Sequence, residues 1–170
     1  MDKIIDNQEK IELSGDEVKR IVGRNIDVIS YHTLGSYNNI NELLGKNKEC
    51  IILYETSYNV GHYVALFINS NNNLEFFDPY GFFPDEELNF AKYDNKPYLS
   101  NLIKSSNYSV LYNKKRLQKW KEGTNTCGRW SSLRLRFKNV KLTSFQYLFT
   151  NNKCYDGDFW VSAITLLLTN

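Results

Sequence analysis

Three closely spaced apolar runs constrain the fold of this chain more than any other feature. They occupy residues 50–54, 62–68 and 74–78, and the Asn-rich segment 69–73 joins the last two. Short apolar runs that end at Gly, Asn or Asp are typical of strands, and a short Asn-rich connection tolerates the positive φ of a tight turn. We therefore predict an antiparallel hairpin formed by residues 62–68 and 74–78, in one sheet with residues 50–54.

Helices are indicated on both sides of these runs. Ser14-Gly15-Asp16-Glu17 matches a capping box and predicts a helix to Val22, which Gly23 stops. Apolar residues at positions 130, 133, 137 and 140 recur at helical spacing and predict a helix over 127–138. Further strands are predicted at 26–31 and 108–112, and further helical segments at 40–45, 85–89, 98–104, 144–150 and 158–168. The resulting fold class is α+β, with a central, mostly antiparallel sheet packed by helices.

Length and composition predict one globular domain over residues 1–170. The chain is 42% hydrophobic and 15% aromatic, and these proportions are higher than those of a disordered chain. No run approaches the roughly 20 apolar residues of a membrane span, and the acidic start differs from a signal peptide. The three cysteines are an odd number without metal-ligand spacing. These features predict no membrane, no metal site and a reducing, intracellular location.

Positive charge is concentrated in one segment. Ten Lys or Arg lie between Asn113 and Lys141 against a single acid, Glu122, although the net charge of the chain is only +2. A solvated positive face explains this distribution. The sharper hypothesis is an anionic partner, such as nucleic acid, bound by residues 113–141.

Cys127 is the candidate nucleophile. It opens the predicted helix 127–138 directly after the polar segment Thr124-Asn125-Thr126. A helix N-terminus and a neighbouring imidazolium both favour the reactive thiolate. Gly128 removes a side chain beside the sulfur, so that a peptide backbone can approach. A lone cysteine is more often a small buried hydrophobe, and it is the rest of the set that favours chemistry.

Three upstream residues complete the set. His62 begins one strand of the hairpin and Asp78 ends the other, so pairing would let the carboxylate fix the tautomer of the imidazole. Asp78 also suits the turn sequence Asp-Pro-Tyr-Gly. Gln118, nine residues before Cys127, would form an oxyanion hole with the backbone N–H of Cys127. His32 has no acid partner in an obvious position and is assigned a structural or surface role.

The order His62, Asp78, Gln118, Cys127-Gly128 resembles that of the adenain-type cysteine proteases. That group includes the adenovirus maturation protease, related enzymes of large DNA viruses and virophages, and the cellular SUMO proteases. The stretch from Phe77 to Phe82 resembles the acid-Pro-aromatic-Gly-Phe stretch of the viral branch. The match covers roughly residues 50–137. Two departures are Tyr63, where the family usually has tryptophan, and a Gln-to-Cys step longer than that of the adenovirus enzyme.

The resemblance implies a papain-like (adenain-type) core whose catalytic order is permuted relative to papain. Cys127 would be the nucleophile and His62 the general base, oriented by Asp78, with Gln118 as the oxyanion donor. Aromatic residues near the site would line a narrow cleft that admits glycine. The candidates for substrate binding are Tyr63, Tyr80, Gly128 and Trp130, with core packing as the alternative for Trp130.

The expected function is that of an endopeptidase in the virion and the host-cell cytoplasm. It would cut capsid or other virion precursor proteins after small, Gly-type residues. A deubiquitinase or deSUMOylase-like isopeptidase, a noncatalytic nucleic-acid-binding module and, well behind, an acetyltransferase are the alternatives. The sequence requires no cofactor. The adenovirus enzyme uses DNA and a peptide as activators, so an activator of either kind stays open, although no residue identifies a peptide partner.

Overall fold

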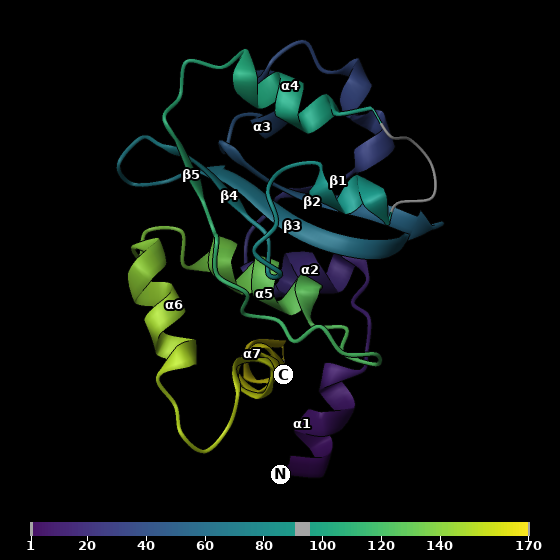
Figure 1. Cartoon of the computed structure of the whole chain (residues 1–170), viewed down its shortest axis with the longest axis vertical. Coiled ribbons are helices and arrows are strands. Elements are labelled where there is room, and N and C mark those ends of the chain that lie inside the picture. Colours follow the sequence, from purple (N-terminus) through teal and green to yellow (C-terminus); the bar gives the residue numbers. More distant parts are fainter. Residues whose placement is uncertain (1, 91–95, 170) are drawn as a thin grey trace.

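A five-stranded sheet lies at the centre of the molecule with helices on both faces (Figure 1). The computed structural model describes residues 2–90 and 96–169. The strands follow the order β1-β2-β3-β4-β5 across the sheet. Their bounds are β1 (Asp27–Ser30), β2 (Glu49–Ser57), β3 (Val60–Ile68), β4 (Leu74–Phe77) and β5 (Val110–Tyr112). The helices are α1 (Asp2–Glu9), α2 (Gly15–Val22), α3 (Ile40–Leu44), α4 (Tyr98–Lys104), α5 (Cys127–Arg136), α6 (Leu142–Thr150) and α7 (Gly157–Thr169), with 3-10 turns η1 (Tyr31–Ser36) and η2 (Glu86–Asn89).

The predicted hairpin forms the middle of the sheet. Strands β3 and β4 pair antiparallel, with Ala65 opposite Phe77, and β2 pairs antiparallel with β3 on the other side. The outer strands β1 and β5 each pair in parallel with their neighbour. The sheet is therefore mixed, and mostly antiparallel because its long central pairs are antiparallel. This confirms the predicted α+β class.

Both faces of the sheet are buried, which explains the unbroken apolar runs of the sequence. Alternate side chains of β2 and β3 point to opposite faces. Ile51 and Ala65 join a core with α2, α5, α6 and α7, whereas Ile52 and Leu66 join a second core with α3, α4 and η1. In Figure 1 these two groups of helices lie below and above the sheet.

Most predicted helices are present close to their expected bounds. The capping box at Ser14 and Glu17 is formed, and Gly23 ends α2 with φ 77° in the left-handed region that glycine favours. The segments α1 and η1 were not predicted. Helix α1 buries only Ile5, so its sequence carries a weak apolar pattern. Within the part of the chain that the structure describes, no helix is long and apolar enough to cross a membrane.

Helix α5 is fixed to the sheet by a buried ion pair. Arg134 on α5 donates to both carboxylate oxygens of Glu75 on β4, at 2.7 and 3.0 Å, and both side chains are fully buried. The guanidinium also donates to the carbonyls of Phe137 and Val140. This ion pair links α5, which begins at Cys127, to strand β4.

Candidate active site

The pairing of β3 with β4 brings His62 and Asp78 together as predicted. Nε2 of His62 lies 3.1 Å from Oδ1 of Asp78, and both side chains are buried. The ring of Tyr80 stacks on the imidazole, with centroids 4.8 Å apart, and its backbone N–H donates to the same Oδ1 at 2.7 Å. Since Nε2 is directed at Asp78, Nδ1 is the nitrogen left for a second partner.

Electrostatics favour a charged His62. Burial acts to lower the pKa of its imidazole, but the charge and hydrogen bond of Asp78 act in the opposite direction. A hydrogen bond and the charge of the Cys127 side chain add to that effect. The pKa of His62 therefore lies well above its ordinary value.

Cys127 is the first residue of α5 and is half-buried. Its sulfur lies 3.8 Å from the carbonyl oxygen of Gly61, the residue before His62. Cys127 and His62 line one cleft of about 190 Å³, together with the predicted residues Gln118, Tyr63 and Tyr80. The structure thus brings three parts of the chain that lie far apart in sequence into one place. The remaining lining residues are Glu12, Leu13, Thr56, Asn59, Val60, Gly61, Thr124 and Asn125.

The amide of Gln118 is buried and held in place. The backbone N–H groups of Leu117 and Gln118 donate to the carbonyl of Pro79, which ties this loop to the turn after Asp78. Nε2 of Gln118 donates to the hydroxyl of Tyr80 at 3.0 Å and to the carbonyl of Thr124 at 3.2 Å. Both amide hydrogens are therefore in use, and an incoming oxygen would have to replace one of these acceptors.

Two predicted lining residues lie elsewhere. Trp130 is fully buried in the core against Phe145 and Phe149, so the alternative of core packing is correct. Gly128 is also buried. A Cβ there would come within 3.2 Å of the Tyr63 ring and 3.3 Å of Leu13, so this glycine lets α5 pack closely rather than admitting a peptide.

Asp158, at the start of α7, was missed by the sequence analysis. Its Oδ1 accepts from the hydroxyl of Thr126 at 2.5 Å and from Nε1 of Trp130 at 2.8 Å. Its Oδ2 accepts from the backbone N–H of Lys119 at 2.8 Å. One buried carboxylate thus ties the Gln118 loop to the first turn of α5. An aspartate beside a glycine at a helix start is a common cap sequence. The sequence therefore gave no signal that Asp158 links the Gln118 loop to α5.

Glu87, on η2, was also missed. Its Oε1 lies 3.6 Å from Nε2 of His62, and its side chain is buried. Among the described residues, His62, Asp78 and Glu87 are the one group whose donor atoms converge closely enough to hold a metal ion. The prediction of no metal site rests on the absence of a CxxC motif and of a Cys/His cluster, and neither criterion detects a group of one histidine and two carboxylates.

The other histidine and the other cysteines have different surroundings. His32 does have an acid partner, because its Nδ1 lies 2.7 Å from Glu55 on β2, which corrects the prediction of none. This histidine is largely exposed. Burial, with the charges of Asp27 and Glu49, raises the pKa of the Cys50 thiol well above its usual range, whereas Cys154 is exposed.

Four of the ten basic residues in the segment 113–141 are buried or paired with acids. Arg129 and Arg134 are buried, and Arg129 donates to Thr165 and Gln8. Lys119 pairs with Glu9 and Asp156, and Lys138 pairs with Glu49. Part of the charge that suggested a nucleic-acid partner is therefore paired within the molecule, whereas Lys114, Lys115 and Arg116 are exposed.

The fold and the site define an α+β protein in which a cysteine at a helix start faces a buried histidine–aspartate pair. No family model matches the chain. It is 32% identical over 145 residues to the uncharacterized protein V9 of Sputnik virophage, and the match covers 81% of this chain and 83% of that protein. The chain therefore belongs to the family of that virophage protein.

Proposed function

We propose that this chain is a cysteine peptidase of the adenain type, with a papain-like core. One observation carries the proposal. Cys127 is half-buried at the start of α5 and lines the same cleft as His62. Nε2 of His62 is hydrogen-bonded to the buried Asp78. This arrangement supplies a nucleophile, a base and the group that orients the base.

The reaction follows from these positions. Nδ1 of His62 takes the thiol proton of Cys127, and the sulfur bonds to the carbonyl carbon of the substrate peptide. The C–N bond breaks as the imidazolium returns that proton to the leaving nitrogen, which leaves a thioester on Cys127. His62 then takes a proton from water and the hydroxide attacks the thioester carbonyl carbon. The C–S bond breaks, the substrate leaves as a carboxylic acid, and the imidazolium returns its proton to the sulfur of Cys127.

Two donors would stabilise the negative oxygen that forms. The backbone N–H of Cys127 lies at the start of α5, where the helix dipole favours negative charge. Nε2 of Gln118 would donate its hydrogen bond to the oxyanion in place of the Tyr80 hydroxyl. A donor of this kind is typically worth about 3 kcal/mol of barrier.

The proposed substrates are virion precursor proteins, cut after small, Gly-type residues in the virion and the host-cell cytoplasm. Membership in the family of a virophage protein supports the viral setting. The small volume of the cleft and the rings of Tyr63 and Tyr80 that line it favour a small residue before the cut.

Cleavage of virion precursors by wild type and by Cys127→Ala tests the proposal. New termini mapped by mass spectrometry should appear with the wild type and be absent with Cys127→Ala. Cys154→Ala is the matched control, because Cys154 is exposed and far along the chain, and it should cleave like the wild type. Cleavage that persists in Cys127→Ala would sink the proposal.

Two further arms of the same experiment separate the remaining alternatives. A ubiquitin-like protein with a reactive C-terminal group should leave Cys127 unmodified, and covalent capture would favour an isopeptidase instead. Adding DNA or virion peptides to the precursor reaction tests whether an activator is needed. A rate that rises in proportion to DNA occupancy and falls with salt would assign an activating role to DNA.

A further inference from the structure

The imidazole of His62 faces two carboxyl groups rather than one. Nε2 lies 3.1 Å from Oδ1 of Asp78 and 3.6 Å from Oε1 of Glu87. The three groups come from β3, from the turn after β4 and from η2. The proposed mechanism needs only Asp78, so Glu87 is a buried ionisable side chain beside the base without an assigned role.

Two oxygens of this cluster lack partners. Oδ2 of Asp78 and Oε1 of Glu87 are buried and have no hydrogen-bond partner among the described residues. A buried carboxylate oxygen that is left unpaired costs free energy. That cost is reduced if one of the two carboxyl groups carries a proton, as paired carboxyl groups in low-dielectric sites do.

We infer that Glu87 is a second carboxyl partner of His62, a positioning residue that works alongside Asp78 to hold the imidazolium opposite Cys127. This inference rests on the proposed function only where it concerns catalysis. The geometry itself requires no particular reaction.

The charges around Glu87 determine how it responds to pH. Burial raises the pKa of Glu87, the charge of His62 lowers it, and the charges of Asp78 and Glu86 raise it further. The resulting pKa of Glu87 is about 7. Tyr80, in the turn after β4, also lies within the electrostatic reach of Glu87. Above that pH the ionised Glu87 places a second negative charge at Nε2, which favours the imidazolium. Below that pH the neutral carboxyl group leaves Asp78 as the single charged partner.

The two histidines of the chain make this directly measurable. Imidazole NMR signals of labelled His62 and His32 can be followed from pH 5 to pH 10, and His32, which contacts Glu55, serves as the internal reference. We expect His62 to shift near pH 7 in the wild type as Glu87 ionises. In Glu87→Gln that shift should vanish and the midpoint of His62 should fall by about one pH unit, the usual effect of losing an adjacent charge. At each pH the signals of His32 should be the same in Glu87→Gln as in the wild type.

Glu86→Gln is the matched control, since Glu86 is the exposed neighbour on the same turn and its amide can still accept from the backbone N–H of Phe83. A His62 titration that is the same in folded Glu87→Gln as in the wild type would overturn the inference. If Glu87→Gln does not fold, the carboxyl carbon of Glu87 in the wild type answers instead. A His62 shift with the same midpoint as that carboxyl carbon supports the inference, and His62 signals that do not follow that midpoint overturn it.

Two more outcomes keep this inference distinct from its competitors. Purified protein should contain no stoichiometric zinc, and a chelator should leave the His62 signals unchanged. Bound zinc would assign the three donors to a metal and overturn the inference. Failure to cleave virion precursors, together with the expected NMR behaviour, would count against the peptidase proposal alone.

Discussion

At the scale of single residues, Glu87 has a consequence for stability as well as for the site. Its pKa in the folded protein is about 7, against an ordinary value of 4.5. The folded state therefore binds more protons than the unfolded state between these values, and stability falls as pH rises through that window. The loss is complete above about pH 7.

The substitution Glu87→Gln should remove this dependence. We expect the free energy of unfolding of Glu87→Gln, relative to wild type, to rise by up to about 3 kcal/mol between pH 5 and pH 8. Urea denaturation at unit pH intervals, with a reducing agent for the three thiols, measures this difference. Comparison at each pH cancels the contributions of all other groups. The same difference for Glu86→Gln should change much less, because the charge of Glu86 is the smallest of the causes that raise the pKa of Glu87. A flat profile for Glu87→Gln would contradict the assignment of its pKa.

The residues that the sequence predicted and those that it missed differ in how they reach the site. His62 and Asp78 could be paired from sequence because a hairpin register places them together. Glu87 and Asp158 come from η2 and α7, whose positions depend on packing between distant segments. A local sequence pattern does not determine which distant segments come into contact. Gly128 was predicted to make room for a substrate backbone, whereas Tyr63 and Leu13 pack against it in the structure.

At the scale of elements, the start of α5 depends on α7. Thr126, which precedes α5, makes no side-chain cap of its own helix, and its hydroxyl donates instead to Asp158. The same carboxylate accepts the backbone N–H of Lys119, next to Gln118. Together with the side-chain bond of Gln118 to Thr124, this contact ties the loop that carries Gln118 to the residues just before Cys127.

Asp158→Asn should therefore loosen the site as well as the fold. An amide nitrogen in place of one carboxylate oxygen leaves a buried donor unpaired, which costs about 1–3 kcal/mol of stability. Amide hydrogen exchange at Lys119 should accelerate, and peptide cleavage should slow more than the fraction of folded protein explains. Thr126→Val should reproduce part of this effect and Thr126→Ser little of it, because serine keeps the hydroxyl. Unchanged exchange at Lys119 in folded Asp158→Asn would refute the link.

At the scale of the whole molecule, the two cores are joined through the sheet, and polar contacts fix which helix lies where. Sequence periodicity predicted most helices and the central strands, since both faces of β2 and β3 are apolar. It could not predict that β1 and β5 pair in parallel, because that depends on long connections. Nor could it separate buried from exposed charges in the segment 113–141, where Arg134 is buried and Lys114 is exposed.

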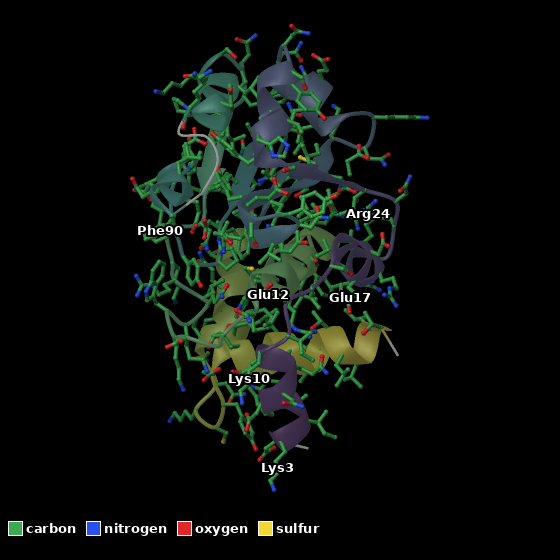
Figure 2. The ribbon with its side chains drawn as sticks, turned by 90° about the vertical axis from the view of Figure 1, so that its right-hand side faces the viewer. Lys3, Lys10, Glu12, Glu17, Arg24 and Phe90 are labelled. Carbon is green, nitrogen blue, oxygen red and sulfur yellow. The ribbon has the colours of Figure 1, made fainter. Side chains whose placement is uncertain are left out.

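The N-terminal segment shows how distant parts complete the cleft. The stretch between α1 and α2 carries Glu12 and Leu13, which line the cleft beside Cys127. Figure 2 labels Glu12 on this stretch, with Glu17 of α2 nearby and Phe90 at the outer edge of the same view. Packing of α1 against α7 holds this stretch in place. Since α7 also carries Asp158, both walls of the cleft depend on the position of α7.

The ion pair between Arg134 and Glu75 is the strongest test of how the sheet positions α5. Both side chains are fully buried, and the guanidinium also lies over the rings of Phe67 and Phe145. Arg134→Met leaves the Glu75 carboxylate buried and unpaired, so it should cost about 3–5 kcal/mol in the free energy of unfolding. Met fills a similar volume, which keeps the loss of packing small.

The double variant Arg134→Met with Glu75→Gln should recover much of this loss, since it removes the orphaned charge. Urea denaturation of the wild type, both single variants and the double variant measures the coupling between the two side chains. Lys138→Met is the matched control: Glu49 keeps its two contacts with Arg24, at 2.6 and 2.8 Å, so the cost should stay below about 1 kcal/mol. If the loss of unfolding free energy in the double variant equals the sum of the losses in the two single variants, Arg134 holds α5 through the carbonyls of Phe137 and Val140 instead. In that case Cys127 would be positioned by the loop after α5 and not by the sheet.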